Sequence, residues 1–524
     1  MTVEAKTGAQ QAEPSVEAAE MSSPQTIVCT NPATGEDFDE IPVTPAEEVD
    51  AAVERAREAQ AHWARLPADE RAQYLLDARE ALLDHRDELH ELIIKETGKA
   101  AIDSLAEQLV LFDTLGYYAR KGPELLEDES VDLHLLKNKR VTIQHAPAGL
   151  VVNISPWNFP LDLSMTPIVP ALIAGNAAII KPSEWTPLTA IRAVEIVNRS
   201  GLPDGLLQAI PGYGETGAKL VDEADAVSFT GSVPTGRKVA VEAARNLVPC
   251  TLELGGKDPL IVLDDADVER AANAAVWGAF FNSGQCCMSV ERAFVHESVY
   301  DEFVERAVQL TRELRQGDPL ESEVDVGAIT FPKQFETIEA HIQDAVDSGA
   351  RVLTGGERRE IGEGDFFAPT ILADVDPEMV VMNEETFGPV LPIMKVPSAA
   401  EAIRLANDSR YGLNASIWSK DRARAQRLAR QVQAGNVCIN DVISSYVAIE
   451  APYGGAKESG VGRRKGIWEI EDFTEPKTIM EDIIGLKKEP FWYPYSGKVI
   501  NGVDKAFEAL FRRGIAGKIR GLFS

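Results

Sequence analysis

Short apolar runs alternate with helical stretches through the middle of the chain, and this alternation restricts the fold more than any other feature. Stretches 187–199 and 234–245 have helical character and lie between such runs. Strands that alternate with helices form parallel sheets covered by helices. The sequence therefore predicts an α/β protein. The runs expected to be strands are 149–154, 177–180, 206–210, 226–229, 251–254 and 260–263.

Helices are predicted on both sides of this region. The segment TPAE at 44–47 has the pattern of a capping box with proline at the first helical position, so a helix should begin there. Further helical runs extend over 69–97, which is followed by Gly98, and over 100–121 and 266–282. Residues 139–145 alternate between polar and apolar, which is typical of a half-exposed strand.

Composition limits the function and the cellular compartment. The formal net charge of −31 excludes nucleic acid as a partner, because phosphates require a basic surface. The five cysteines have no regular spacing, which favours a reducing compartment, and we expect a cytoplasmic protein. The first 25 residues are small, polar and acidic, with no signal-peptide pattern, and are expected to be disordered. No run of about 18 apolar residues predicts a membrane span.

The last part of the chain differs in charge from the rest. Residues 487–524 contain eight Lys or Arg and three acidic residues. The segment VDKAFEALFRRGIAGKIRGLF at 503–523 is predicted to form a basic amphipathic helix. Such a helix can lie on an anionic membrane surface. It can equally bind the acidic body of the same or a partner subunit, which is the interpretation we favour.

Two glycine-rich segments are candidates for phosphate binding. GYGETG at 212–217 matches G-x-G-x-x-G, but no acidic residue follows at the expected distance, so a plain turn before a helix is the favoured reading. FTGSVPTG at 229–236 leaves a strand, turns at Gly231 and offers Ser232 as the N-cap of a helix. A helix N-terminus binds anions through its free backbone N–H groups.

Three residue types suggest catalysis. Cys286 and Cys287 are adjacent, but a vicinal disulfide is strained and no His or Cys cluster completes a metal site, so no metal is predicted. Glu253 ends an apolar strand, where burial raises a carboxyl pKa and makes a general base. Asn158 stands in the rigid loop PWNFP and can donate to an oxyanion. Taken singly, Glu253 also fits a carboxylate satisfied by its neighbours, and Asn158 fits a turn-stabilising residue.

Six motifs in one order then indicate a family. They are ISPWNFP at 154–160, KPSE at 181–184, FTGSVPTG at 229–236, ELGGK at 253–257, GQCC at 284–287 and ETFGP at 385–389. Together they resemble the NAD(P)-dependent aldehyde dehydrogenase superfamily over residues 26–484. The interval of 34 positions between Glu253 and Cys287 is the one that this family keeps between its base and its nucleophile.

The resemblance implies a role for each matching residue. Cys287 is the nucleophile and Cys286 a bystander, Asn158 and the Cys287 N–H stabilise the alkoxide, and Glu253 activates the hydrolytic water. The implied reaction converts an aldehyde to a carboxylic acid through a thiohemiacetal and a thioester, with hydride transfer to NAD or NADP. NAD is favoured, because Glu184 would repel a 2′-phosphate. The residues implied to bind the cofactor are Trp157, Lys181, Glu184, Gly231, Ser232, Gly236, Glu385 and Phe387.

The resemblance also implies an architecture and a homodimer or homotetramer. It consists of a Rossmann-type cofactor domain, an α/β catalytic domain and a small β-extension that joins subunits. The expected ranges are 26–126 with 148–254 for the cofactor domain, 255–458 for the catalytic domain, 127–147 with 472–484 for the oligomerisation strands, and 487–524 for the basic tail.

The substrate is less constrained than the reaction. CMSVER at 287–292 and GVGRR at 460–464 resemble a subgroup that includes succinate-semialdehyde dehydrogenases. Arg464 stands where many hydrolytic members have a second glutamate, and we hypothesise that it shapes the substrate mouth or a subunit contact. Arg292 is the other candidate partner for an anionic substrate, although a structural role is favoured. The alternatives are a medium-chain, long-chain or aromatic aldehyde dehydrogenase with a membrane-associating tail, a non-redox cysteine esterase, and a scaffold protein on an inactive enzyme fold.

Overall fold

The computed structural model describes residues 25–489 and 491–511, and it has the α/β architecture that the sequence predicts. The N-terminal tail predicted to be disordered lies outside the described residues except for Gln25, as do residues 512–524 of the predicted basic helix. The chain divides into two compact units, residues 1–127 with 145–475 and residues 128–144 with 476–524.

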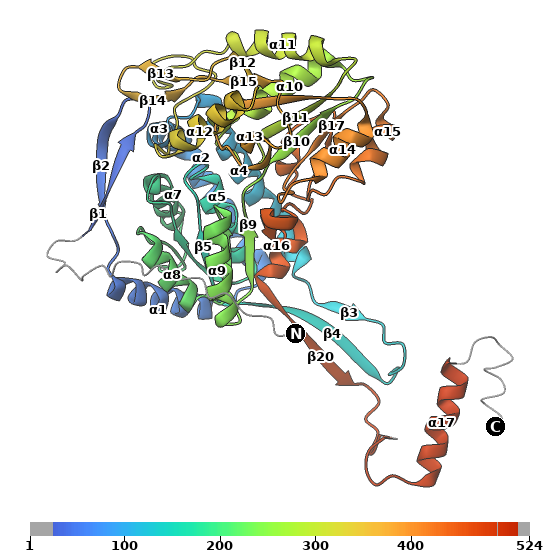
Figure 1. The fold of residues 1–524 in the computed structure, drawn as a ribbon. Helices are drawn as coiled ribbons and strands as arrows, with labels where there is room; N and C mark the ends of the chain where they lie inside the picture. Colours follow the sequence, from blue (N-terminus) through green and yellow to red (C-terminus); the bar gives the residue numbers. More distant parts are fainter. Residues whose placement is uncertain (1–24, 490, 512–524) are drawn as a thin grey trace, which may run out of the picture. The chain divides into compact units, whose positions relative to one another are not determined.

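The first unit contains a six-stranded sheet, and the predicted strand at 149–154 is the first of its strands along the chain. Its order is β19-β9-β8-β5-β6-β7, parallel except for β19. Figure 1 labels β9 and β5 of this sheet. The central strands are buried on both faces, which explains why they read as continuous apolar runs. The strands are β5 (Leu150–Ile154), β6 (Ala177–Lys181), β7 (Leu207–Ala209), β8 (Ala226–Thr230), β9 (Cys250–Glu253) and β19 (Gly460–Val461).

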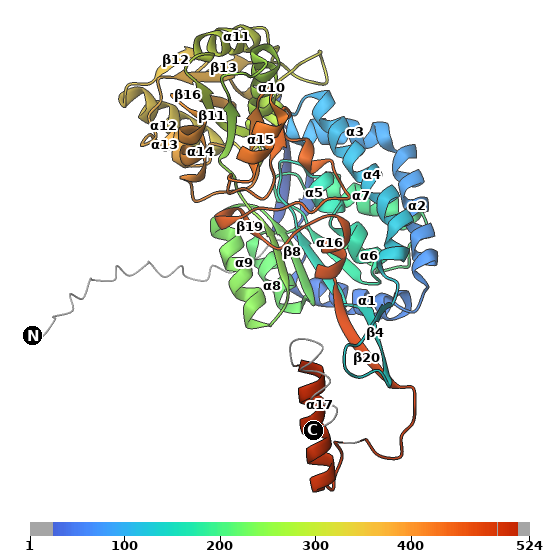
Figure 2. The ribbon, with the colours of Figure 1, turned by 90° about the vertical axis from the view of Figure 1, so that its right-hand side faces the viewer.

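Helices before and between these strands pack against the sheet or against the helices that cover it, and Figure 2 shows them from a second side. They are α1 (Ala46–Trp63), α2 (Ala68–Asp84), α3 (Arg86–Thr97), α4 (Ala101–Leu125), α5 (Asp162–Met165), α6 (Ile168–Ile173), α7 (Pro187–Arg199), α8 (Gly214–Glu223) and α9 (Val233–Arg245).

A seven-stranded sheet lies in the same unit. Its order is β12-β15-β16-β11-β10-β17-β18, and only β12 runs antiparallel. Its strands are β10 (Asp258–Val262), β11 (Val290–His296), β12 (Arg351–Thr354), β15 (Thr370–Ala373), β16 (Val390–Val396), β17 (Ser416–Trp418) and β18 (Cys438–Ile439). The helices of this region are α10 (Val268–Phe280), α11 (Tyr300–Arg312), α12 (Gln334–Asp347), α13 (Val380–Asn383), α14 (Ala399–Asn407) and α15 (Arg422–Ala429), whereas α16 (Gly466–Asp472) contacts α6 beside the six-stranded sheet.

Three local predictions differ from the structure. The helical run 69–97 is two helices that break at His85, whose φ of −104° is not helical. Helix α1 begins after Pro45 without a side-chain cap, so the predicted capping box does not form. Two short hairpins have no counterpart in the predicted strands, namely β1 (Thr26–Asn31) with β2 (Glu36–Pro42), and β13 (Arg358–Ile361) with β14 (Gly364–Phe367).

The second unit contains most of a three-stranded sheet and a helix. The sheet has the order β20-β4-β3, with strands β3 (Glu129–Val131), β4 (Lys139–Pro147) and β20 (Thr474–Asp482). The half-exposed strand predicted at 139–145 is therefore confirmed as part of β4. Helix α17 (Gly497–Phe511) covers the described part of the predicted basic amphipathic segment.

Candidate active site

The carboxyl ends of four neighbouring parallel strands carry most of the predicted site residues. Since the carboxyl ends of parallel strands meet at one edge of a sheet, ligands of open α/β sheets bind there. The last residue of each strand and the loop after it are Ile154 with 155–160, Lys181 with 182–186, Thr230 with 231–232, and Glu253 with 254–257.

A cavity of about 300 Å³ opens at this edge and brings the predicted catalytic residues together. Cys287 reaches it from the loop after α10, and two further lining residues come from the loop before β16. Among the described residues that line this cavity there is no Lys or Arg. The predicted residues in its wall are Trp157, Asn158, Gly231, Ser232, Glu253, Cys287, Glu385 and Phe387.

After helix α10 the chain makes a strained turn before the two cysteines. Asn282, Ser283 and Gly284 all have positive φ, at 52°, 59° and 72°. Such strain persists where the surrounding structure holds it. The Ser283 hydroxyl donates to the Gly327 carbonyl over 2.9 Å, and a Cβ on Gly284 would lie 2.2 Å from the Gly388 carbonyl oxygen. These contacts hold the nucleophile loop in one arrangement.

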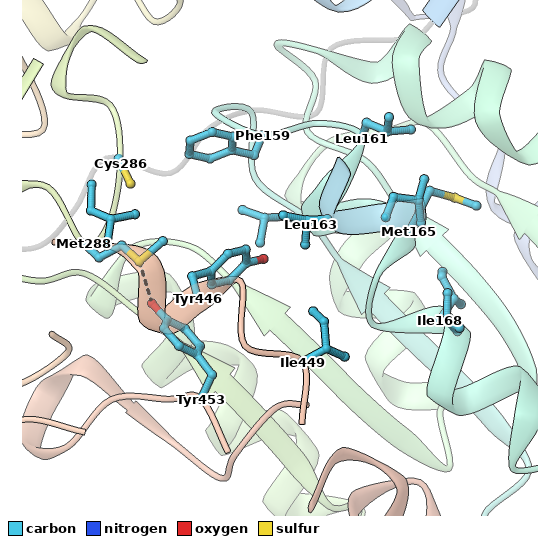
Figure 3. Close-up of a cluster of buried hydrophobic side chains, with 14 of the residues drawn as sticks. Phe159, Leu161, Leu163, Met165, Ile168, Cys286, Met288, Tyr446, Ile449 and Tyr453 are labelled. Atoms are coloured by element: carbon cyan, nitrogen blue, oxygen red, sulfur yellow. Dashed lines mark hydrogen bonds between the residues drawn. The ribbon is translucent and has the colours of Figure 1, made fainter. Parts of the chain in front are cut away.

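The two cysteines occupy different environments. A hydrogen bond with the Cys286 thiol, followed by burial, raises the pKa of Cys287 well above its usual value, so the resting group is a thiol. Cys286 is 2% exposed and belongs to a buried hydrophobic cluster with Met288 and Tyr453 (Figure 3). The Tyr453 hydroxyl donates to Met288 Sδ over 3.4 Å. Of the two cysteines, Cys287 alone lines the cavity.

Asn158 is fixed by contacts with the nucleophile loop. Its side-chain nitrogen donates to the Gln285 carbonyl over 2.9 Å. Its own backbone carbonyl accepts from Asn282 Nδ2 over 3.0 Å and from Lys99 Nζ over 2.7 Å. Because an amide nitrogen carries two N–H groups, one donor of Asn158 is left for a ligand in the cavity.

Glu253 has the environment of a general base. Burial raises its pKa to about 8, and the positive charge of Arg464 is the largest effect in the opposite direction. Its Oε1 has no hydrogen-bond partner among the described residues, and a Cβ on Gly454 would lie 2.9 Å from that oxygen. The backbone of Glu253 is held by the Gly231 N–H, which donates to its carbonyl over 3.0 Å. The carboxylate is therefore fixed by its strand and free to bind a small molecule.

Arg464 lies in the interior, so the hypothesis that it shapes the substrate mouth is wrong. Its guanidinium is 3% exposed and does not line the cavity. It pairs with Glu469 through Nε and Oε1 at 3.1 Å, and it donates to the Thr166 hydroxyl over 3.2 Å and the Thr230 hydroxyl over 3.5 Å. Glu469 is five residues further along the chain, but Thr166 and Thr230 come from distant segments, and no local signal in the sequence places them beside Arg464.

The loop with Glu385 and Phe387 is held from beneath by Glu291. The Phe387 N–H donates to Glu291 Oε1 over 2.9 Å, and the Phe387 ring packs edge-on against Trp157 with centroids 5.5 Å apart. Glu385 Oε1 accepts from the Gly256 N–H over 2.8 Å. Burial, together with the negative charge of Glu291, raises the pKa of Glu385 to about 8. This wall of the cavity is therefore rigid and aromatic.

A second cavity, of about 680 Å³, adjoins the first. It contains Lys181 and Glu184, whose side chains pair at 3.2 Å, and Ser232 at the start of α9. Gly214 and Gly217 of the hexamer at 212–217 also line it, although the sequence favoured a plain turn there. The two cavities share Pro156, Trp157, Thr230, Gly231, Ser232 and Phe331.

Three residues of this region differ from the sequence-based expectations. Gly236 lines neither cavity; a Cβ there would lie 2.4 Å from Leu254 Cδ2, so this glycine allows α9 to approach β9 closely. Lys238 and Glu242 were not predicted, yet both line the second cavity from α9. Their spacing of four residues on the helix that starts at Ser232 is the signal that could have identified them.

Arg292 does not reach either cavity. Its guanidinium donates to the carbonyls of Lys257, Leu405 and Ala406 at 2.9 to 3.2 Å. It thereby satisfies carbonyls near the end of α14, which fits the structural role that the sequence favoured.

The described residues contain neither a metal-binding cluster nor a membrane-spanning helix. No group of three or more His, Cys, Asp or Glu side chains in residues 25–489 and 491–511 is arranged to hold a metal ion. No helix in the same residues combines the length and the apolar composition that a membrane crossing requires.

Comparisons with known proteins agree with this geometry. The sequence pattern of the aldehyde dehydrogenase family matches residues 19–479. A 4,4'-diapolycopene aldehyde oxidase from Methylomonas is 41% identical over 476 residues, which are 90% of this chain and 88% of that protein. A Mycobacterium ulcerans protein with the provisional name succinate-semialdehyde dehydrogenase (NADP+) 2 is 38% identical, covering 85% of this chain and 86% of its own.

Solved structures extend the comparison to the fold. The crystal structure of an NAD-dependent aldehyde dehydrogenase from Sinorhizobium meliloti superimposes with a TM-score of 0.86 and 33% identity, covering 91% of this chain and 95% of that one. The fold predicted from the six motifs is therefore confirmed.

Proposed function

Because the chain belongs to the aldehyde dehydrogenase family, we propose that it oxidises an aldehyde to a carboxylic acid at Cys287, with NAD or NADP as hydride acceptor. One observation carries the proposal. A single cavity contains the thiol of Cys287, the amide donor of Asn158 and the carboxyl group of Glu253, whose pKa is raised. These are the groups that attack on a carbonyl, alkoxide stabilisation and hydrolysis require.

The first step takes place at Cys287. Its sulfur bonds to the aldehyde carbon, the thiol proton leaves to solvent, and the carbonyl oxygen becomes an alkoxide. The free N–H of Asn158 and the backbone N–H of Cys287 donate to that oxygen. Because Asn158 is already fixed by Gln285, it needs no rearrangement to do so.

The cofactor fits the second cavity. A Cβ on Gly217 would meet only Ile154 and Lys181, at 3.6 and 3.9 Å, and one on Gly214 would meet nothing within 4 Å, so these glycines leave room that side chains would fill. Lys181 and Glu184 would hold the adenosine ribose, Ser232 would face the pyrophosphate, and Glu385 and Phe387 would hold the nicotinamide end. When bound, NAD or NADP would supply the hydride acceptor for the former carbonyl carbon, and Cys287 would then carry a thioester.

The last step releases the acid. Glu253 takes a proton from water, whose oxygen bonds to the thioester carbon, and the carbon–sulfur bond breaks. The electron pair of that bond goes to sulfur. The sulfur takes up one proton to give the Cys287 thiol, which offsets the proton that Glu253 removed from water and leaves Glu253 ready for the next cycle once it is deprotonated. The high pKa of Cys287 favours this return to the thiol.

The substrate we propose is an uncharged aldehyde rather than succinate semialdehyde. An anionic substrate needs a cation in the site. No Lys or Arg is among the described residues that line the cavity, while Arg292 and Arg464 are both occupied elsewhere. The wall is instead largely apolar, with Leu163, Leu254 and Phe387. The medium-chain, long-chain or aromatic alternative therefore has more support.

The test is the absorbance at 340 nm with NAD or NADP and a panel of short, anionic, aromatic and long-chain aldehydes. We expect an increase with uncharged aldehydes and little with succinate semialdehyde. No increase with any aldehyde would overturn the proposed function. Hydrolysis of activated esters without any cofactor-dependent oxidation would favour the cysteine esterase.

We also propose a separate function for each part of the chain. Residues 26–126 with 148–254 would bind the cofactor and 255–458 would supply catalysis, while the strands of 127–147 and 472–484 would join subunits. Strand β20 supports the last point, because it is an edge strand with Ile479 and Met480 about half exposed. Sedimentation of wild type against a chain shortened before β20 tests it, with loss of the dimer or tetramer expected.

The tail is a candidate for contact with an anionic lipid surface. Helix α17 keeps an apolar stripe 39–62% exposed, formed by Ile500, Val503, Phe507, Leu510 and Phe511. Lys498 and Lys505 accompany it, which is the composition of an interfacial helix. Deletion of 490–524 should remove co-sedimentation with anionic liposomes and leave the oligomer unchanged. A changed oligomer with unchanged lipid binding would favour a subunit contact instead.

A further inference from the structure

Five ionisable side chains form a buried cluster at the active site. Each is only 3–5% exposed. They come from the end of β9, from α5, from the segment after β19 and from α16. The cluster consists of Glu253, Asp162, Arg464, Lys465 and Glu469.

Arg464 occupies the centre of this cluster. It pairs with Glu469, and its contact with the Thr230 hydroxyl brings it to the strand beside Glu253, since Thr230 and Glu253 are partners in the β8–β9 register. Its backbone forms two hydrogen bonds with Tyr453, of 2.7 and 2.9 Å. The guanidinium is therefore fixed at both ends and cannot turn to solvent.

The other members are also held in place. The Tyr446 hydroxyl donates to Asp162 over 2.7 Å, and the Lys465 ammonium lies over the Tyr446 ring, 3.3 Å from its centroid. The Lys465 N–H donates to Glu469 Oε2 over 2.8 Å. Apart from Glu253, the side chains of the cluster are therefore not free to move away from an unfavourable charge.

The number of charges matters because the cluster is buried. Three carboxyl groups face two cations, so full ionisation leaves one uncompensated negative charge away from water, which is costly. Removal of one cation would leave two such charges. The cluster can thus keep only a limited number of carboxylates ionised, and Arg464 is a cation that Glu253 depends on.

We propose that Arg464 is a positioning residue for the hydrolytic step, where its fixed positive charge keeps Glu253 in the carboxylate form that takes a proton from water. This inference rests on the proposed function. The effects on the Glu253 pKa agree with this inference. Burial raises that pKa, and the charge of Arg464 is the largest of the effects that lower it. The charged and titratable groups that face Glu253 are Arg463, Arg464, Lys465, Glu469, Cys287 and Tyr453.

The experiment compares Arg464→Gln with Arg464→Lys and Arg463→Gln. Steady-state turnover and the pre-steady-state burst of NAD(P)H are measured from pH 6 to pH 10 with an aldehyde that wild type oxidises. In Arg464→Gln the rise of turnover with pH should move to higher pH by about 1 to 3 pH units. Turnover at pH 7 should fall at least about tenfold, while the burst of one equivalent per site remains.

The matched variants separate charge from shape. Arg464→Lys keeps the charge and should keep the pH profile. Arg463→Gln removes the same charge from a half-buried neighbour and should move the profile less. If Arg464→Gln gives no burst because Glu469 is left unpaired and the chain misfolds, the double variant Arg464→Gln/Glu469→Gln replaces it. Its profile should still move upward, since Arg464 affects Glu253 more than Glu469 does.

The outcomes distinguish this inference from the proposed function. A wild type without NAD(P)H formation for any aldehyde overturns the function. A wild type that turns over, with variants whose profiles do not move although their bursts are intact, overturns the role of Arg464 alone. An equal shift in Arg464→Lys and Arg464→Gln would also overturn it, because shape rather than charge would then be responsible.

Discussion

Lys99 donates a hydrogen bond from its buried ammonium group to the backbone carbonyl of Asn158, over 2.7 Å. The same ammonium forms an ion pair with Glu107, which is also fully buried. Glu107 Oε2 in turn accepts from the N–H groups of Leu161 and Asp162, at 3.0 and 3.2 Å. A buried ion pair thus anchors both ends of the loop that carries the proposed oxyanion donor.

Replacement of Lys99 by methionine should therefore impair both stability and catalysis. It leaves Glu107 buried without its cation, which costs about 3–5 kcal/mol of unfolding free energy. A loop that shifts by about 1 Å can lower turnover roughly a hundredfold. Urea denaturation and steady-state kinetics measure the two effects.

The double variant Lys99→Met/Glu107→Gln is the matched control. A glutamine can still accept from the Leu161 and Asp162 N–H groups, and no unpaired charge remains. We expect it to be more stable than Lys99→Met. A double variant that is less stable than the single one would contradict this account of the ion pair.

Substitution of Cys286 should make Cys287 more reactive rather than less. The hydrogen bond that the Cys287 thiol makes with Cys286 is the largest cause of the raised pKa of Cys287, so Cys286→Ala should lower that pKa and speed alkylation near pH 8. Oxidation should persist in this variant, whereas Cys287→Ser should reduce it at least about a thousandfold. Iodoacetamide labelling with peptide mapping identifies which thiol reacts. Loss of oxidation in Cys286→Ala with normal folding would contradict the assignment.

The predicted strands at the centre of the six-stranded sheet match the structure because burial on both faces makes them continuous apolar runs. The hairpin β1–β2 lacked that signal, since its second strand is exposed or half-buried throughout. The break at His85 lies inside a pattern that remains helical in sequence, so only the packing of α2 and α3 shows it.

The residues of the site also divide into those that local motifs predict and those that only tertiary packing determines. Cys287, Glu253 and Asn158 stand in motifs, and the strand ends that lead to Glu253 and Asn158 meet the loop of Cys287 in one cavity. The prediction for Arg464 is wrong because its contacts with Thr166 and Thr230 are determined by tertiary packing. The prediction of a plain turn at 212–217 is incomplete, because Gly214 and Gly217 line the second cavity, and the strand before the hexamer is the signal for that position.

Glu253→Gln should separate the formation of the thioester from its hydrolysis. A carboxyl pKa raised to about 8 means that half of the groups are in the base form at pH 8, so wild-type turnover should rise through pH 8 and level off roughly one to two pH units above it. The amide cannot accept the proton of water, so turnover should fall by roughly a hundredfold or more above pH 8, and by less at lower pH, where wild-type Glu253 is itself mostly protonated. One equivalent of NAD(P)H per site should still appear in stopped flow. A variant that turns over normally would show that another group is the base.

Glu184 should control the choice between NAD and NADP. Its carboxylate pairs with Lys181 at 3.2 Å in the proposed adenosine cavity, where it can accept from a ribose 2′-OH and would repel a 2′-phosphate. Two unit charges 4 Å apart interact by about 1 kcal/mol even at the dielectric constant of water, and by more in a partly buried site.

Glu184→Gln removes this repulsion and releases Lys181 to meet the phosphate. We expect the ratio of kcat/KM for NADP to that for NAD to rise roughly tenfold, since about 1.4 kcal/mol corresponds to that factor. Glu242→Gln removes a carboxylate from the same cavity but from helix α9, and serves as the control. If both variants change the ratio equally, the general charge of the cavity decides the cofactor. A change confined to Glu184→Gln assigns the discrimination to the side chain paired with Lys181, because that is where the 2′ position would lie.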